Sequence, residues 1–120
     1  MIQKLEISGV HMDVGDDLRK YVVKKIGRLD RYVSRHARVS LHAEIKLKEG
    51  KNKGKSERTC EVVLFAPHEV LTVNETTINI YAAVDIAEEK LKTQLKKYKD
   101  AHAGPQLHRR VLARLKREES

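Results

Sequence analysis

A chain of 120 residues has room for one domain with a single core, and its net charge of +8 fits a polyanionic partner. No apolar run approaches the roughly 20 residues of a membrane span, and the first residues lack the apolar stretch of a signal peptide, so we expect no membrane partner and a cytosolic location. The single Cys60 excludes an internal disulfide and a cysteine-rich zinc site, and one Phe, four Tyr and no Trp are too few for a base-stacking sheet.

The first predicted elements are a short strand and a helix. Leu5 and Ile7 alternate with polar neighbours, which predicts a strand over residues 2–8. Gly27 weakens the helix that follows by about 1 kcal/mol relative to Ala, which suggests a close packing contact there. Apolar residues recur every three or four positions across 16–33 and predict this helix: Leu18, Val22, Ile26, Leu29 and Val33.

Three strands are predicted in the middle of the chain. Residues 49–56 are rich in glycine and lysine and predict a mobile, basic hairpin loop. Residues 58–66 and 69–75 predict the two strands that follow it, joined by a Pro-His turn. The strand before the loop, 39–48, has one buried and one wet face, because apolar residues alternate with polar ones: Val39, Leu41, Ala43, Ile45 and Leu47.

A second long helix is predicted to begin after Asn79, which is a good N-cap. Apolar residues recur at helical spacing as far as Tyr98, and a Gly-Pro pair then ends the helix. We expect a domain over residues 1–102 and a basic tail over 103–120, either a short amphipathic helix or a frayed end. The order β-α-β-β-β-α predicts an α+β sandwich, a four-stranded sheet with two helices on one face.

Positive charge is gathered at particular places along the chain. Residues 59–89 hold six acids and no lysine or arginine, whereas residues 90–99 hold five lysines and no acid. Helical spacing aligns basic side chains on the first helix, namely Lys20, Lys24, Arg28 and Arg31, with Lys25 beside them. The second helix carries two neighbouring lines, one formed by Lys90, Gln94 and Lys97 and the other beginning at Lys92.

If the two helices lie side by side, these stripes can merge into one surface that follows a phosphate backbone and releases counterions at each neutralised phosphate. The plainer alternative is that helix faces exposed to water are usually charged, and that lysine is a good helix former. Two basic helices and a basic loop, together with a lysine-free acidic segment, favour a nucleic-acid partner without indicating which one.

No catalytic grouping is visible, and we expect no catalytic residue, no metal ligand, no cofactor and no small-molecule substrate. Cys60 lies inside a predicted strand and is expected to be a small core residue. The six histidines show no metal-ligand spacing such as H-x-x-x-H. Carboxylates that share a helix face, such as Asp85 and Glu89, are common, and no glycine-rich phosphate loop accompanies them.

Residues 80–100, IYAAVDIAEEKLKTQLKKYKD, resemble the signature of the ribosome hibernation promoting factors. This family is also known as the ribosome-associated inhibitors or the sigma-54 modulation proteins. Residues 7–33 are similar to the family's first strand and helix, and the resemblance covers about residues 1–102. The order β-α-β-β-β-α is the family's fold, which is itself similar to a double-stranded-RNA-binding domain.

The resemblance implies binding to the small ribosomal subunit and its rRNA, in the channel between head and body. There the protein covers the positions of mRNA and of the A- and P-site tRNAs, so that translation stops and the whole ribosome is stored. The family's basic positions that contact rRNA lie on both helices, where this chain carries Lys25, Arg28, Lys90 and Lys97. Gln94 matches a glutamine of the family's pattern and is included in the expected rRNA-binding set. The alternatives are a stand-alone double-stranded-RNA-binding module and, third, a hydrolase or nuclease that acts on RNA.

The chain departs from the family's pattern in two ways. Thr93 stands where many relatives carry Arg, so that one contact is lost or transferred to Lys92, about 100° around the helix. Long relatives add a C-terminal domain that pairs two ribosomes, whereas this sequence stops at residue 120. It therefore resembles either a short form or a fragment of a long one.

Overall fold

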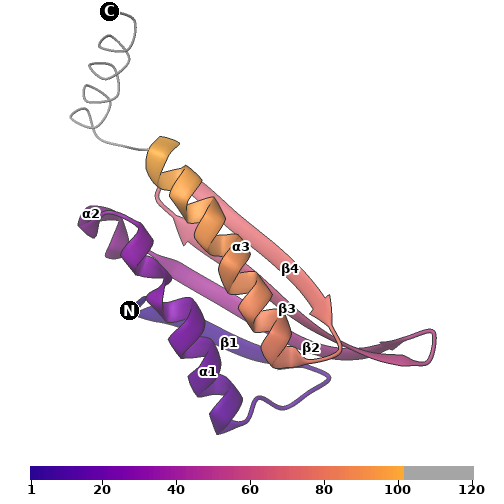
Figure 1. Ribbon diagram of the computed structural model, residues 1–120. Coiled ribbons are helices and arrows are strands. Elements are labelled where there is room, and N and C mark those ends of the chain that lie inside the picture. The colour runs from indigo at the N-terminus through magenta and orange to yellow at the C-terminus, as the bar shows by residue number, and fades with distance from the viewer. Residues whose placement is uncertain (102–120) are drawn as a thin grey trace, which may run out of the picture.

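The computed structural model describes residues 1–101, so the tail predicted over 103–120 lies outside the described residues. The elements follow the predicted order, with two short helical turns added after the first helix (Figure 1). In chain order they are β1 (Lys4–Val10), α1 (Asp16–Gly27), η1 (Arg28–Tyr32), α2 (Arg35–Arg38), β2 (His42–Asn52), β3 (Lys55–Ala66), β4 (Glu69–Thr77) and α3 (Ile80–Ala101).

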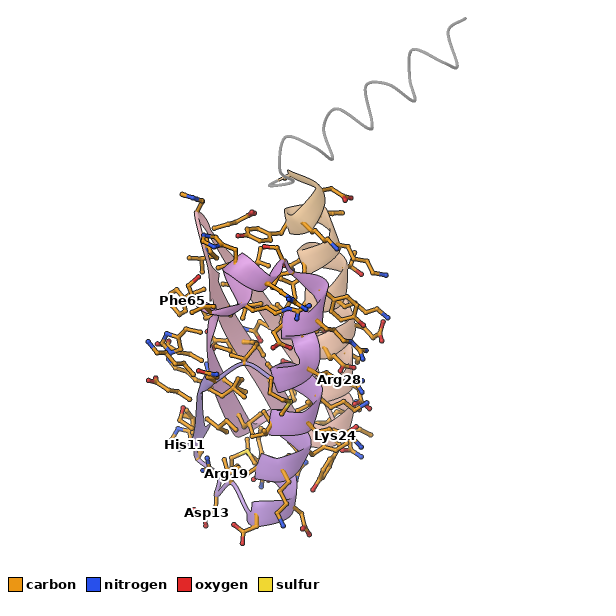
Figure 2. The ribbon with its side chains drawn as sticks, turned by 90° about the vertical axis from the view of Figure 1, so that its left-hand side faces the viewer. His11, Asp13, Arg19, Lys24, Arg28 and Phe65 are labelled. Carbon is orange, nitrogen blue, oxygen red and sulfur yellow. The ribbon has the colours of Figure 1, made fainter. Side chains whose placement is uncertain are left out.

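The four strands form one sheet in the order β1-β2-β3-β4. β1 pairs parallel to β2, and the remaining two pairings are antiparallel. α1 and α3 lie side by side over one face of the sheet, as Figure 1 shows from the front and Figure 2 from the side. The predicted α+β sandwich with both long helices on one face is therefore confirmed. No helix within residues 1–101 is long and apolar enough to cross a membrane.

The core lies between the sheet and the two helices. Cys60 is fully buried, which confirms that it is a core residue. Burial raises the pKa of its thiol to about 12, so no reactive thiolate is expected at neutral pH. The strands contribute Ala43, Ile45, Leu47, Cys60, Val62, Leu64, Leu71 and Val73, which pack against Leu18, Val22 and Ile26 of α1 and Val84, Leu91 and Leu95 of α3.

The first helix ends earlier than its apolar spacing predicted. α1 stops at Gly27, and the next five residues continue as the 3₁₀ turn η1. At that point the Gly27 carbonyl accepts a hydrogen bond from Ile2 N at 2.8 Å, a donor from outside the helix. A Cβ on Gly27 would lie 3.0 Å from the terminal methyl of Met1, so the close packing contact predicted for Gly27 is confirmed.

The strand predicted over 39–48 starts too early, because Val39 is 88% exposed and β2 begins at His42. The residues before it form the short helix α2, in which Ser34 Oγ caps the turn by accepting from Ala37 N at 3.3 Å. Arg38 Nε also donates to the Val33 carbonyl at 3.2 Å. These local bonds hold the backbone in a helical turn. The alternation of apolar and polar residues that begins at Val39 therefore does not mark the start of the strand.

The prediction of a mobile loop over residues 49–56 is wrong as well. β2 and β3 continue their pairing to the tip of a long hairpin, and only Lys53 and Gly54 form the turn. Both have positive φ, at 54° and 80°, as in the two-residue turns whose twist matches that of paired strands. Glycine and lysine content suggested an irregular loop, but the backbone pairing of the two strands overrides composition.

The other boundaries agree closely with expectation. The Pro-His turn joins β3 to β4 as predicted, with His68 at a φ of 69°. Asn79 caps α3 as predicted, because its side-chain oxygen accepts a hydrogen bond from Tyr81 N at 2.9 Å. β1 is displaced by two residues from its predicted range, and β4 extends two residues further, to Thr77.

Candidate nucleic-acid interface

A row of polar contacts joins α1 to α3. The Tyr21 and Tyr81 rings meet edge to face, with centroids 4.9 Å apart. The Tyr21 hydroxyl donates to the Asp85 carboxylate, and Lys25 Nζ lies 3.5 Å from Asp85 Oδ1. These contacts place Lys25 on the flank of α1 that faces α3.

Glu88 is the most buried carboxylate of this row, with a side chain only 7% exposed. Arg28 Nε donates to Glu88 Oε2 at 2.7 Å, and Lys25 Nζ lies 3.9 Å from Oε1. A buried carboxylate is costly unless it is paired and hydrogen-bonded, so pairing with the two cations offsets the cost of burying the Glu88 side chain. The hydrogen bond to Glu88 also raises the pKa of Arg28. We call Tyr21, Lys25, Arg28, Asp85 and Glu88 the interhelical seam.

The seam was not found from the sequence. Asp85 and Glu89 were noted as sharing a helix face, but Asp85 and Glu88 are the pair that faces α1. Their spacing of three residues, with Lys25 and Arg28 three apart on the other helix, was an available signal. The sequence could not show that these two pairs meet across 60 positions of chain.

We expect the Tyr21–Asp85 hydrogen bond to be visible in a titration, because it raises the pKa of Tyr21 from 10.0 to about 12, with desolvation adding to the shift. The folded state then holds the Tyr21 proton more tightly than the unfolded chain. The bond therefore stabilises the fold fully below pH 10 and loses this effect as the pH rises through about 12. Phenolate absorbance, measured as the difference between the wild type and Tyr21→Phe, isolates this group.

In the Asp85→Asn variant the carboxylate acceptor is gone, and the Tyr21 pKa should fall back toward its ordinary value. Tyr81→Phe is the matched control, because it removes a neighbouring hydroxyl without touching the acceptor. A Tyr21 pKa that is the same in the wild type and in Asp85→Asn would contradict the proposed hydrogen bond.

Lys20 and Lys24 lie on the solvent side of α1. Both are exposed, and neither has a carboxylate partner among residues 1–101. Together with Arg19, Val23, Met1 and Arg28 they border a shallow hollow on the outer surface of α1. Figure 2 shows Arg19, Lys24 and Arg28 following one another along this helix. We call Lys20 and Lys24 the α1 ridge.

Arg31 and Lys92 meet at one aromatic ring, that of Tyr32. Arg31 Nη2 donates to the Tyr32 hydroxyl at 2.9 Å, and the guanidinium carbon lies 5.0 Å from the ring centroid. Lys92 Nζ approaches the same ring from α3, at 5.6 Å. The hydrogen bond from Arg31 lowers the pKa of Tyr32. This contact joins the positive charge of the two helices, and the sequence reading did not include Tyr32.

Lys90, Gln94 and Lys97 lie on the opposite flank of α3, next to β4. Lys90 forms an ion pair with Glu75, and Gln94 Nε2 donates to the Thr72 carbonyl at 3.3 Å. Lys97 borders a shallow hollow beside β4 together with Gln94. The expected merging of the two stripes therefore holds for Lys92 but not for these three residues.

Thr93 sits between these two flanks on the exposed side of α3. Its hydroxyl donates to the Glu89 carbonyl at 3.2 Å, within the same helix. The solvent side of α3 therefore presents no cation at this position.

One group on the far face of the sheet has side chains of metal-ligand chemistry. Potential ligand atoms of Glu6, His42 and Glu44 lie within 4.8 Å of one another, on the neighbouring strands β1 and β2. Spacing along the sequence could not reveal this group, because Glu6 joins it only through strand pairing. The group is open to solvent and lies on the face of the sheet opposite the helices, so it is separate from the basic surface.

Residues 5–103 match the model of the sigma 54 modulation protein / S30EA ribosomal protein family. The chain belongs to this family. The resemblance identified from residues 80–100 and 7–33 is thereby confirmed.

Curated relatives carry the name ribosome hibernation promotion factor. The Lactococcus lactis protein is 34% identical over 96 residues, which cover 80% of this chain and 49% of that protein. The Deinococcus radiodurans protein is 34% identical over 100 residues, which cover 82% of this chain and 50% of that protein. The chain thus spans about half the length of the curated relatives it matches.

Solved structures share the fold. The N-terminal domain of Thermus thermophilus Protein Y superposes with a TM-score of 0.65 at 33% identity, covering 81% of this chain and 97% of that structure. A ribosomal subunit interface protein from Coxiella burnetii gives a TM-score of 0.66 at 23% identity, covering 82% and 99%. At that identity the second match supports the fold alone.

Proposed function

We propose that this chain is a ribosome hibernation factor that binds the decoding region of the small ribosomal subunit and blocks the binding of mRNA and tRNA. The observation that carries the proposal is that Arg31 and Lys92 meet at the Tyr32 ring and so bring cations from both helical segments together. Lys20 and Lys24 of the α1 ridge add exposed positive charge along α1. The names of the curated relatives support a role in hibernation. The decoding region and the small subunit are our inference from the family's resemblance.

Inhibition in this proposal is steric and electrostatic. Cationic side chains on a rigid pair of helices bind rRNA phosphates, and the bound domain occupies the space that mRNA and tRNA would take. No bond is made or broken, so one protein silences one ribosome. The protein acts in the cytosol, where it meets assembled ribosomes as well as free small subunits.

The test combines sedimentation with translation. Purified protein is mixed with small subunits, large subunits and whole ribosomes at several salt concentrations, and its sedimentation with each is measured. We expect binding to small subunits and whole ribosomes that weakens steeply with salt, and inhibition of translation that saturates near one protein per ribosome.

Two outcomes would contradict the proposal. Equal binding to bare double-stranded RNA and to the small subunit would favour a general double-stranded-RNA-binding module. Progressive degradation of RNA by substoichiometric protein would favour a nuclease.

A further experiment measures competition. If the protein covers the positions of mRNA and tRNA, ribosomes that already hold mRNA and tRNA should bind less of it.

A further inference from the structure

We infer that Lys25 and Arg28 are positioning residues of the ribosome-binding surface, and that unpaired cations, led by Lys20 and Lys24, make its phosphate contacts. This inference rests on the proposed function and divides its basic residues into two classes. The division reverses the assignment that the resemblance implied for the helix predicted over 16–33, where Lys25 and Arg28 matched rRNA-contacting positions.

The first argument is the charge balance of the seam. Its two cations, Lys25 and Arg28, face two carboxylates, Asp85 and Glu88, at distances of 2.7 to 3.9 Å. A phosphate that approached these cations would also approach both carboxylates. The seam therefore presents little net positive charge to a polyanion, although it contains two of the basic residues predicted from the sequence.

The second argument is the burial of Glu88. Arg28 Nε is bonded to a carboxylate whose side chain is 7% exposed, so a phosphate that drew the guanidinium away from Glu88 would break this bond. Removing one partner of a buried ion pair leaves an uncompensated buried charge, which is strongly unfavourable. Arg28 is consequently held in place by α3, and Lys25 is held by Asp85 and Glu88 together.

The same reasoning divides the rest of the predicted set. Lys90 is paired with Glu75 of β4, so it belongs with the neutralised cations. Gln94 is occupied by the Thr72 carbonyl. Within residues 1–101 the cations of the set that have no carboxylate partner are Lys20, Lys24, Arg31, Lys92 and Lys97.

The seam has a distinct role in this scheme, because it fixes how α1 sits against α3. The hydrogen bond from Arg28 to Glu88 and the bond from Tyr21 to Asp85 tie the two segments at points about one turn apart on α3 and about two turns apart along the first helical segment. The ridge of α1 and Lys92 of α3 are then presented at a constant spacing to a rigid ribosomal surface. A preorganised arrangement of this kind lowers the entropy that binding must overcome.

Counterion release distinguishes the two classes. A lysine that neutralises a phosphate releases its counterions on binding, so the logarithm of the binding constant falls with the logarithm of the salt concentration, and each lost contact reduces the slope by about one. A lysine that carboxylates already neutralise releases few counterions when a phosphate binds, so its loss changes the slope little.

The experiment measures binding of the full chain to purified small subunits over a series of salt concentrations. The proteins compared are the wild type, Lys24→Ala, Lys25→Ala and Glu88→Gln.

We expect Lys24→Ala to reduce the slope by about one, and Lys25→Ala to leave it within about 0.3 of the wild-type value while lowering the melting temperature. Glu88→Gln keeps an acceptor for Arg28 but removes the negative charge, and should therefore steepen the slope by up to about one. A damaged fold would weaken binding, but it would not steepen the salt dependence. Should Lys25→Ala fail to fold, Glu88→Gln decides the question.

Equal slope losses for Lys24→Ala and Lys25→Ala would overturn the inference, as would a slope for Glu88→Gln that is unchanged or shallower than that of the wild type. Either result would assign direct phosphate contacts to the seam. Failure of the wild type to bind small subunits at low salt would instead overturn the proposed function, and the inference with it. The two failures are therefore distinguishable in one data set.

Discussion

Replacing Lys20 and Lys24 together by glutamine is expected to lower the affinity for the small ribosomal subunit by about a hundredfold. Both side chains are exposed on the solvent side of α1 and have no carboxylate partner within the described residues 1–101. A hydrogen bond to a charged group contributes roughly 1.5 kcal/mol or more, so the loss of two phosphate contacts corresponds to about 3 kcal/mol or two orders of magnitude. Binding to purified small subunits at one fixed salt concentration measures this effect.

The matched control is Lys4→Gln with Lys46→Gln. These lysines are also exposed, and their removal changes the net charge by the same amount. They lie on the face of the sheet that the helices do not cover, as the strand register places Lys4 beside His42 and Lys46 two positions beyond Glu44. We expect less than a threefold change in affinity, because bulk charge without local contact has a weak effect at physiological salt, where the Debye length is about 8 Å. Comparable losses in both double variants would indicate a nonspecific charge effect and remove the case for the α1 ridge.

Truncation of Leu91 to alanine is expected to produce the largest loss of stability. Leu91 lies at the middle of α3, is fully buried, and belongs to the core cluster under both helices. A buried Leu→Ala change typically costs about 2–5 kcal/mol, out of a total of about 5–15 kcal/mol for a small domain. The melting temperature, followed by circular dichroism, should fall by about 10 °C or more.

Two companion variants make this result interpretable. Leu91→Met keeps the side-chain volume and should cost less than about 1.5 kcal/mol. Ile86→Ala removes a side chain of the same size from the exposed side of the same helix, where Ile86 is 38% exposed, and should have a small effect. A Leu91→Ala variant as stable as Ile86→Ala would mean that α3 does not pack on the sheet as described.

The order of the elements was determined by the sequence, because each rests on a local signal. A strand with one buried face alternates and a helix repeats every three or four residues, so Leu18 to Ile26 and Ile80 to Tyr98 define their helices without reference to the rest of the chain. The N-cap at Asn79 is local too, since its side chain bonds a backbone amide two residues away. The boundaries failed where competing local bonds decided the backbone, as at Val39, or where strand pairing extended through a glycine-rich segment.

Only the tertiary structure determined which of the basic side chains form ion pairs with carboxylates of other elements. Helical periodicity placed Lys25, Arg28 and Lys90 on lines along their helices, but it could not show which line would face another element. That depends on how α3 is rotated over the sheet, and the rotation is set by burial of Leu91 and its apolar neighbours in the core. Once α3 is seated, one flank presents Asp85 and Glu88 to α1, and the other places Lys90 beside Glu75 of β4. Coulomb attraction between charges acts over a few ångströms of space, so an ion pair such as that of Lys25 with Glu88 forms between residues 63 positions apart in the sequence (88 − 25).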